Sequence, residues 1–586
     1  MPNTHGLNYF LTDPNLKLLL EMYVSASEWE RAWPHLIRLG EIAGSELERL
    51  ARVADKHPPE LVTYNPRGER VDEVVYHPAY HEMEKIGFGQ FGLHAMTHRE
   101  GVLGWPGPFT HVLKYAFWYL FAQAEFGLCC PMSMTDTAAT VLERFGSEEL
   151  KKTYLPRMLS TDMDQLWTGG QFMTEKQGGS DVGANTVVAK HVGDRWELWG
   201  DKWFCSNASA DVILVLARPE GAPEGTKGLG LFLVPRRLPD GARNRFRINR
   251  LKDKLGTKDM ASAEVTFEGA VGYVVGELSK GFKQMMTMVN LSRLSNAVRS
   301  AAMMRRSYLE ALVSTRGRMA FGQPIAQLPL MQETLFELML DTEAAASLVF
   351  YTAHVYDRAE KEGGDAQTLL RTLTPLLKGT ICKRARYTTA EGMEARGGNG
   401  YIEEWVNARL VRDAHLGSVW EGTTNIIALD VLRALRKNQA ADVFFGEIQQ
   451  LLDGLTDPTV RQVADLFGPV VKRVHAQAER ILHMEKAEQE MFSKRLMNRM
   501  VHVAVVTLFL REAEFLIVRE NNYRKLLLSV HYLYRAFLSH GLDEPECLDR
   551  NIRQWLQPLI DWEPIPVEAV QTLLSQLKNQ LTLSIS

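Results

Sequence analysis

The chain has few cysteines for its length and no pair of them spaced for a metal or a redox centre. A sequence of 586 residues contains only Cys129, Cys130, Cys205, Cys382 and Cys547, and no CxxC motif occurs. An odd, scattered set of this kind indicates neither a disulfide framework nor a zinc site, so no metal is expected. A reducing compartment, the cytoplasm, fits this cysteine usage best.

Long apolar runs and a strong net charge are also missing. The longest apolar stretch, VHVAVVTLFL at 501–510, is about half of the roughly 20 residues that cross a bilayer, and charged residues flank it. We expect a buried helix there and no membrane span. The first twenty residues lack a basic leader followed by an apolar run, so no export signal is predicted. A formal net charge of −4 argues against nucleic acid or an anionic membrane as the main partner.

Two common nucleotide-binding motifs are absent. No GxGxxG follows an expected strand, and GxxxxGK[ST] does not occur, so neither a dinucleotide-binding fold nor a P-loop is predicted. Any nucleotide-like cofactor must be held by another kind of site.

The spacing of apolar residues divides the chain into four regions. Helical periodicity dominates residues 1–165, interrupted by turn-rich pieces such as HPPELVTYNPRGER. Short β-rich runs over 166–282, separated by Gly, Pro and Asp, predict a central antiparallel β domain. Helical spacing returns over 283–436 as a helix bundle, and 437–586 form an additional helical region. We therefore expect a mainly α fold, with a ligand site where such units meet.

Two motifs suited to ligand binding lie at the entrance to the predicted β domain and at the end of one of its strands. In MTEKQGGSD at 173–181 the glycines allow close backbone approach, and Thr174 and Ser180 offer hydroxyl groups. GDKWFCSNA at 200–208 supplies Phe204 at the end of a predicted strand. Taken alone, the first motif is better explained as a Gly-Ser surface turn, and the aromatic residues of the second are equally well explained as ordinary core residues.

Two further motifs lie in the helical region that follows. In RGRMAFGQPI at 316–325, Arg318 can bind phosphate, although a solvated arginine at a helix end is the simpler alternative. The last constellation comprises EARGGNGY at 394–401 and VRDAHLGSVWEGTTN at 411–425.

In this order and at this spacing, the four motifs resemble those of the acyl-CoA dehydrogenase family of flavoproteins over roughly residues 80–436. The family patterns are of the VTEPGAGSD, KxWITN, RxxFG, GGNG and YEGT kinds. HPPELVTYNPRGERVDEVVYHPAYHEME at 57–84 and CCPMSMTDTAAT at 129–140 further resemble the AidB-like subgroup of alkylation-response flavoproteins. The resemblance implies bound FAD, an acyl-CoA substrate, and a fold of N-terminal helical domain, β-barrel and four-helix bundle, followed by an extra C-terminal helical domain.

The resemblance also implies roles for individual residues. Glu421 matches the catalytic glutamate that removes the α proton of the thioester while the β hydrogen leaves as hydride to FAD. Contacts to FAD are implied for Thr174, Gly179, Ser180, Phe204, Ser206, Arg318, Phe321, Gly397, Gly398, Thr423 and Asn425. Contacts to the substrate are implied for Ser180, Asn290, Arg293 and Gly422.

The same resemblance implies partners. The arginine of RxxFG and the glycines of GGNG usually reach FAD held mainly by a neighbouring subunit, which implies a homodimer or homotetramer with shared sites. An electron-transfer flavoprotein is the usual electron acceptor.

Several positions depart from the family or allow another explanation. Phe204 stands where many relatives have Trp, and Arg396 stands where many have an apolar residue. Ser292 occupies the position that holds the base in some members, which leaves Glu421 as the only family-consistent base. Taken alone, Glu421 would suit a helix start with a favourable dipole, and Arg293 could form an ion pair within or between helices instead of binding CoA.

Alternative functions remain open at this stage. An AidB-like flavoprotein that binds DNA or protects against alkylation needs a basic surface, yet residues 441–586 contain 16 Lys and Arg against 19 Asp and Glu. Nitroalkane-oxidising relatives use Asp as base, and a catalytically degenerate interaction protein would not need Glu421. The sequence defines neither acyl chain length, branching or aromaticity, nor dimer against tetramer.

Overall fold

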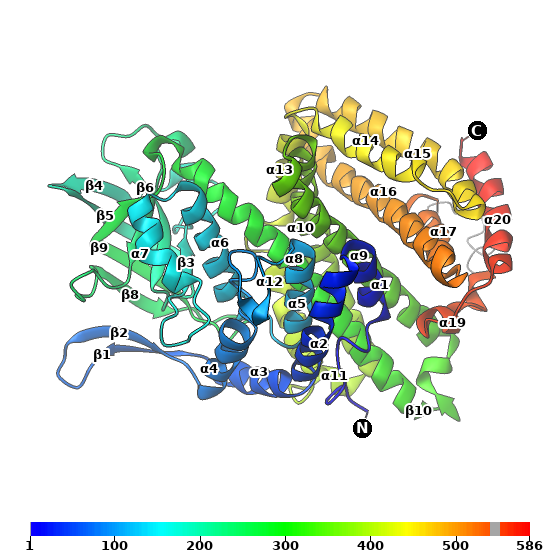
Figure 1. Ribbon diagram of the computed structural model, residues 1–586, viewed down its shortest axis with the longest axis horizontal. Coiled ribbons are helices and arrows are strands. Elements are labelled where there is room, and N and C mark those ends of the chain that lie inside the picture. Colours follow the sequence, from blue (N-terminus) through cyan, green and yellow to red (C-terminus); the bar gives the residue numbers. More distant parts are fainter. Residues whose placement is uncertain (1, 539–550, 586) are drawn as a thin grey trace. The chain divides into compact units, whose positions relative to one another are not determined.

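The computed structural model describes residues 2–538 and 551–585, so Cys547 lies outside the described residues. The chain forms two compact units (Figure 1). We call residues 1–37, 111–116 and 296–586 the bundle unit, and residues 38–110 and 117–295 the barrel unit. The division falls within three helices, α2 (Ala26–Ala43), α5 (His111–Ala124) and α8 (Gly281–Gly317).

The barrel unit is built on a closed β-sheet. Its strands are β3 (Gly169–Phe172), β4 (Val188–Val192), β5 (Arg195–Ser206), β6 (Val212–Pro219), β7 (Gly230–Pro235), β8 (Phe246–Leu251) and β9 (Ser262–Val274). The order β6–β4–β5–β9–β7 returns to β6, while β3 pairs with β6 and β8 pairs with β9. The predicted β-barrel is thereby confirmed; most pairings are antiparallel, and β3–β6 and β4–β6 are parallel.

Apolar side chains fill this sheet because its central strands are covered on both faces. β6 begins VILVLA and β7 reads GLFLVP, with every residue of these runs buried. Continuous apolar runs of this length are typical of strands that have no solvent face. The core of the barrel unit includes Phe172, Leu198, Phe232 and Val265, all fully buried.

The remaining elements of the barrel unit are α3 (Glu46–Lys56), α4 (Pro78–Glu84), α6 (Cys129–Phe145), α7 (Glu148–Met158) and one hairpin. The sequence pattern predicted a loop where β1 (Glu60–Tyr64) and β2 (Arg70–Val75) form this hairpin. Asp72, completely buried, accepts a hydrogen bond from the backbone N–H of Ile248 at 3.1 Å and from the Arg243 guanidinium. These bonds join the hairpin to β8.

The bundle unit contains the long helices expected after the β domain. They are the last part of α8, α9 (Pro329–Glu362), α10 (Gly364–Arg396), α12 (Val406–Gly417) and α13 (Thr424–Leu435), with the short elements β10 (Met319–Ala320), β11 (Gln323–Pro324) and α11 (Gly398–Tyr401) between them. α9 packs along α10, and α10 also contacts α12 and α13. α1 (Pro14–Tyr23) packs on α9.

The C-terminal helices belong to the same compact unit. They are α14 (Ala440–Asp453), α15 (Pro458–Leu482), α16 (Lys486–Glu520), α17 (Arg524–Phe537), α19 (Leu556–Ile560) and α20 (Val567–Ile585), and α14 to α16 lie side by side in Figure 1. The apolar run 501–510 lies inside α16 and is almost wholly buried, as predicted. Within the described ranges, no helix combines the length and apolarity needed to cross a membrane.

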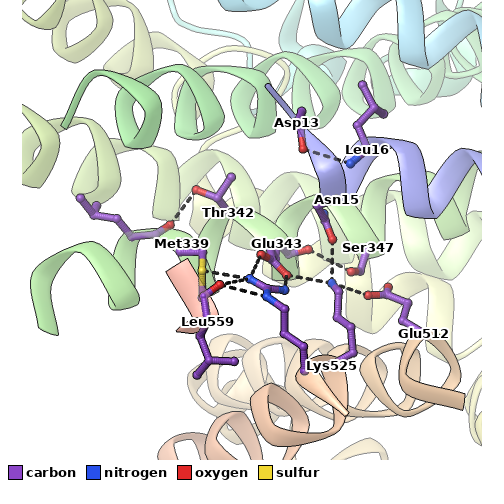
Figure 2. Close-up of polar contacts among 12 residues, drawn as sticks. Asp13, Asn15, Leu16, Met339, Thr342, Glu343, Ser347, Glu512, Lys525 and Leu559 are labelled. Carbon is purple, nitrogen blue, oxygen red and sulfur yellow. Dashed lines mark hydrogen bonds and ion pairs between the residues drawn. The ribbon is translucent and has the colours of Figure 1, made fainter. Parts of the chain in front are cut away.

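A buried cluster of charges joins these helices to α9 (Figure 2). Glu343 of α9 binds Arg524 at 2.7 Å and Lys525 at 2.9 Å, and Lys525 also binds Glu512 at 2.6 Å and Asn15 of α1 at 2.7 Å. All four charged side chains are at most 4 % exposed. Two cations compensate the charges of two carboxylates where water is excluded, so this cluster fixes α16 and α17 against α9.

Candidate active site

The loop Thr174–Asp181 is locked onto β5 by a buried ion pair. Lys202 of β5 is 2.8 Å from Glu175, and the two side chains are 0 % and 3 % exposed. Glu175 also accepts hydrogen bonds from the backbone N–H of Thr186 at 2.6 Å and of Val187 at 3.1 Å. Although burial raises the pKa of Glu175, Lys202 and these donors hold it below its usual value. The carboxylate is thus fully used in fixing the loop.

Groups suited to a flavin stand at the surface of this fixed platform. Phe204 is 56 % exposed at the end of β5, beside Ser206, whose hydroxyl lies 3.1 Å from that of Ser262. The backbone N–H of Trp203 donates to the Thr174 carbonyl at 2.9 Å, which brings the loop next to this strand end. An exposed aromatic ring with hydroxyl groups nearby fits the edge and face of an isoalloxazine.

Glycine is required in the loop for a steric reason. A Cβ at Gly179 would lie 2.8 Å from the Thr174 hydroxyl oxygen, closer than side-chain carbons normally approach. Gly179 and Ser180 are both exposed. The loop therefore offers its backbone to a ligand while the Thr174 side chain packs beneath it.

The predicted CoA contacts lie in the part of α8 that belongs to the barrel unit. Arg293 is buried and donates to the Asn290 side-chain oxygen at 3.1 Å, one turn earlier on the same helix. The acceptor is a neutral amide, so this bond is not the ion pair of the alternative explanation, and the role of Arg293 toward CoA stays a prediction. Ser292 is also buried.

Glu421 occupies a backbone corner immediately before α13. Its φ is +57°, and that of Gly422 is +104°. Thr423 is the N-cap residue of α13, so Glu421 lies outside the first helical turn. A non-glycine residue in the left-handed region carries a conformational cost that surrounding structure must hold in place, and such residues cluster at functional sites. Glu421 thus precedes α13 at its N-terminal end, and its role as the base stays a prediction.

Two buried cations surround this corner. Lys378 of α10 is 1 % exposed and donates to the Gly422 carbonyl oxygen. Arg299 of α8 is also 1 % exposed, and its guanidinium carbon lies 5.0 Å from the ring centre of Trp420, the residue before Glu421. A charge-assisted hydrogen bond on one side and a cation–π contact on the other hold the corner from two helices.

Residues after the corner present a helix N-terminus to solvent. Thr423 and Asn425 are exposed at the start of the twelve-residue α13. Free backbone N–H groups and the helix dipole favour an anionic group at such a position, which fits a pyrophosphate.

The RxxFG and GGNG motifs meet in the bundle unit. The hairpin β10–β11 holds Phe321 at a φ of +52° and 92 % exposed. Arg318 donates to the Arg396 carbonyl oxygen at 2.7 Å, and its guanidinium lies 3.6 Å from where a Cβ of Gly397 would be. Gly397 ends α10 and Gly398 begins α11, and both are exposed.

The predicted site residues thus form two internally ordered sets. Thr174, Gly179, Ser180, Phe204, Ser206, Asn290 and Arg293 belong to the barrel unit, and Arg318, Phe321, Gly397, Gly398, Glu421, Gly422, Thr423 and Asn425 to the bundle unit. Sequence reasoning missed three residues that order these sets, Glu175, Lys202 and Lys378. Glu175 and Lys202 lie inside the quoted motifs, where a charged residue among small or aromatic ones could have indicated a buried ion pair. No sequence pattern marked Lys378.

Comparison with known proteins agrees with this arrangement. Residues 1–165 match the adaptive response protein AidB N-terminal domain, residues 170–270 the acyl-CoA dehydrogenase middle domain, and residues 279–436 the acyl-CoA dehydrogenase C-terminal domain. Acyl-CoA dehydrogenase family member 11 of Caenorhabditis elegans is 35 % identical over 464 residues, covering 77 % of this chain and 74 % of the relative. The putative acyl-CoA dehydrogenase AidB of Escherichia coli is 39 % identical over 416 residues, covering 68 % and 73 %.

Solved structures give the same result. The crystal structure of Caenorhabditis elegans ACDH-11 in complex with C11-CoA superposes with a TM-score of 0.83 at 30 % identity, covering 91 % of each chain. The chain belongs to the acyl-CoA dehydrogenase family, whose members are FAD-dependent oxidoreductases acting on CH–CH bonds. Within that family its N-terminal region makes it AidB-like.

Proposed function

We propose that this chain, with FAD bound, converts an acyl-CoA thioester to the trans-enoyl-CoA and that Glu421 removes the α proton. The observation that carries the proposal is the backbone corner at Glu421. Its φ is +57°, a glycine follows it, and Lys378 donates a hydrogen bond to the carbonyl oxygen of that glycine. A strained backbone fixed by a buried cation is the arrangement expected of a base that must meet one carbon–hydrogen bond.

The proposed reaction balances as follows. The α C–H bond breaks and its proton passes to the Glu421 carboxylate, while the β hydrogen leaves with its electron pair and a carbon–carbon double bond forms. FAD supplies the acceptor for that hydride when bound. Hydrogen bonds to the thioester carbonyl, including the backbone N–H of Glu421, would stabilise the negative charge that develops on oxygen. Gly422 and Ser180 would line the substrate side, and Ser292 cannot replace the base because it has no carboxylate.

The FAD contacts are proposed for the two ordered sets. Thr174, Gly179, Ser180, Phe204 and Ser206 would hold the flavin, and Thr423 and Asn425 would hold the pyrophosphate. Arg318, Phe321, Gly397 and Gly398 would reach FAD held mainly by a second copy of the chain, in a homodimer or homotetramer. Phe321 is 92 % exposed, so its ring is accessible to a second copy of the chain. An electron-transfer flavoprotein would reoxidise the flavin, and the cytoplasm is the expected location.

The test is anaerobic titration of the flavin absorbance with straight, branched and aromatic acyl-CoAs. The C11-CoA held by the ACDH-11 structure makes a straight-chain thioester of that length the first to add. We expect one class to bleach the wild-type flavin and none to bleach Glu421→Gln. Glu404→Gln, which changes an exposed carboxylate of the same unit, serves as the control and should behave like wild type. Bound flavin that no acyl-CoA reduces would overturn the proposal and favour an AidB-like protective role.

A further inference from the structure

Arg396 is a charged residue that is buried. It is 2 % exposed at the end of α10 and pairs with Glu310 of α8, which is likewise 2 % exposed. Its guanidinium carbon lies 4.3 Å from the ring centre of Trp405. A buried arginine paired with a carboxylate and stacked on an indole has one defined position, so it fixes the end of α10.

Glu310 collects donors from three separate segments. Arg396 and the Thr4 hydroxyl both donate to it, and Arg306 donates at 2.9 Å. Thr4 is 2 % exposed. The segment before α1 is thereby attached to the same carboxylate that holds α10.

Pro2 places this segment against both predicted cofactor motifs. Its carbonyl oxygen accepts from Arg396 at 3.4 Å. Its ring lies where a Cβ of Gly317 would be, with the Pro2 Cγ only 2.1 Å away from that position. Gly317 directly precedes Arg318, and Arg396 directly precedes Gly397. Pro2 therefore contacts Gly317, which precedes the RxxFG motif, and Arg396, which precedes the GGNG motif.

Arg318 lies close to the backbone at Arg396 and Gly397. The Arg318 guanidinium donates to the carbonyl oxygen of Arg396 at 2.7 Å and lies over Gly397. The orientation of that peptide group depends on the Arg396 side chain, which is held by Glu310 and Pro2. A shift at Arg396 must therefore move the hydrogen-bond acceptor that directs Arg318.

We propose that Pro2, Thr4, Glu310 and Arg396 form a clamp that positions Arg318 and Gly397 for the FAD of a neighbouring subunit. None of the four is proposed to touch FAD; Arg396 is a positioning residue that acts through Arg318. This inference rests on the proposed role of Arg318 and Gly397 in binding FAD.

The experiment measures FAD retention by purified holoprotein, from the rise of flavin fluorescence on serial dilution. The variants are Arg396→Leu, which removes the guanidinium but keeps a large side chain, Arg318→Ala, and the two combined. Glu394→Gln, an exposed charge change on the same turn of α10, is the control. We expect Arg396→Leu to raise the apparent Kd for FAD about tenfold, the order of effect of losing one positioned charged hydrogen bond, and Glu394→Gln to leave it unchanged. The double variant should be no weaker than Arg318→Ala alone, because a residue that acts through Arg318 has nothing left to position.

Three results would overturn the clamp. One is wild-type FAD retention by Arg396→Leu when Arg318→Ala has lost it. Another is a double variant in which the losses of FAD-binding free energy from the two single variants add, because additivity would mean that Arg396 does not act through Arg318. Wild-type retention by Arg318→Ala itself would remove both the clamp and the cofactor role of Arg318, while leaving bleaching by acyl-CoA as the separate test of Glu421.

A second variant keeps the test decisive if Arg396→Leu does not fold. Gly317→Ala adds one methyl group where the Pro2 ring lies and leaves every charge in place. We expect it to weaken FAD retention without slowing flavin reduction in FAD-saturated protein. Unchanged FAD retention in Gly317→Ala would overturn the proposal.

Discussion

At the scale of single residues, the backbone conformation at Glu421 determines where its carboxylate is placed. Glu421 is recognisable in SVWEGTTN, but its left-handed φ and its place before the N-cap of α13 come from the folded chain. Lys378, which binds the carbonyl of the next residue, lies on another helix. We therefore propose that the corner and its buried lysine act together.

Lys378→Met tests that unit. Removing the ammonium group leaves the Gly422 carbonyl without its charged donor and lets the corner relax, so the Glu421 carboxylate no longer meets the α carbon in one position. We expect flavin reduction by acyl-CoA to slow by about tenfold to a hundredfold, as for a small misplacement of a reacting group. FAD binding should be unchanged. The measurement is stopped-flow absorbance, with Lys383→Met, an exposed lysine on the same helix, as control. Reduction at the wild-type rate in Lys378→Met would show that the lysine does not hold the base.

The sequence predicts residues inside motifs better than the partners that fix them. Glu421, Phe204 and Arg318 stand in short patterns that resemble those of the family. Lys378 is remote in sequence from Gly422, and nothing in the spacing of α10 distinguishes it from a surface lysine. Arg396 was noticed only as a departure, because its partner Glu310 lies on another helix. Pairing between distant elements depends on packing, which local periodicity does not encode.

At the scale of elements, charged pairs buried between secondary structures decide where loops and helices are held. Lys202 ties the Thr174–Asp181 loop to β5, and His98 is held between two carboxylates of α6. Both pairs lie within the barrel unit.

Lys202→Met should disrupt the loop. Glu175 would remain buried at 3 % exposure without its cation, an arrangement that typically costs about 3–5 kcal/mol. We expect a lower free energy of unfolding, measured by urea denaturation, together with weaker FAD retention. Lys190→Met on β4 is the matched control, since that lysine is 47 % exposed and 4.0 Å from its carboxylate. Equal stability of the two variants would argue against the locking role of Lys202.

His98 makes the free energy of unfolding depend on pH in the alkaline range. Its two ring nitrogens lie 2.8 Å from Asp136 and 2.9 Å from Glu143. Burial lowers the pKa of His98, but these carboxylates outweigh burial and raise it to about 9. A folded-state pKa above the unfolded value means that the stabilisation is fully present below about pH 6.5 and is lost as the pH rises through about 9.

The measurement is the free energy of unfolding of wild type and His98→Gln between pH 6.5 and 9.5. The difference between the two proteins should shrink steadily over that range. A difference that does not change with pH would contradict a protonated His98 in the folded state.

Element types were easier to predict than their pairing. The change from helical to alternating spacing located the β domain, and the return of helical spacing located the bundle. The β1–β2 hairpin was expected as a loop, although ELVTY alternates and NPRG is a turn signal, because a five-residue strand is a weak pattern beside long helices. The parallel β3–β6 and β4–β6 pairings and the β7–β9 pairing join strands that are not neighbours in sequence, so local patterns could not reveal them.

At the scale of the whole molecule, the C-terminal helices share a core with the helix bundle. Family matches cover residues 1–165, 170–270 and 279–436, while the three boundaries between the four predicted domains remain predictions. α16 packs on α9, α10 and α13. The Glu343 cluster is the polar centre of that packing (Figure 2).

Glu343→Gln tests how strongly the C-terminal helices are held. Burial raises the pKa of Glu343, but Arg524 and Lys525 lower it to about 2, so the carboxylate is charged at neutral pH. Its neutral replacement leaves two buried cations with less compensation, which typically costs about 3–5 kcal/mol. We expect faster limited proteolysis of residues after 437 and a lower thermal midpoint. Glu362→Gln, a 59 % exposed carboxylate at the end of the same helix, should match wild type. Wild-type proteolysis of Glu343→Gln would show that apolar packing alone holds these helices.

The most direct test of the central claim is the rate of flavin reduction by an acyl-CoA that carries deuterium at the α carbon. The account predicts that α-deuteration slows the wild-type reaction, and that Glu421→Gln lowers the rate by roughly 10²–10⁴-fold, the usual contribution of a general base, while FAD stays bound. Reduction of the Glu421→Gln flavin at the wild-type rate, with the same isotope effect, would contradict the assignment of Glu421 as the base.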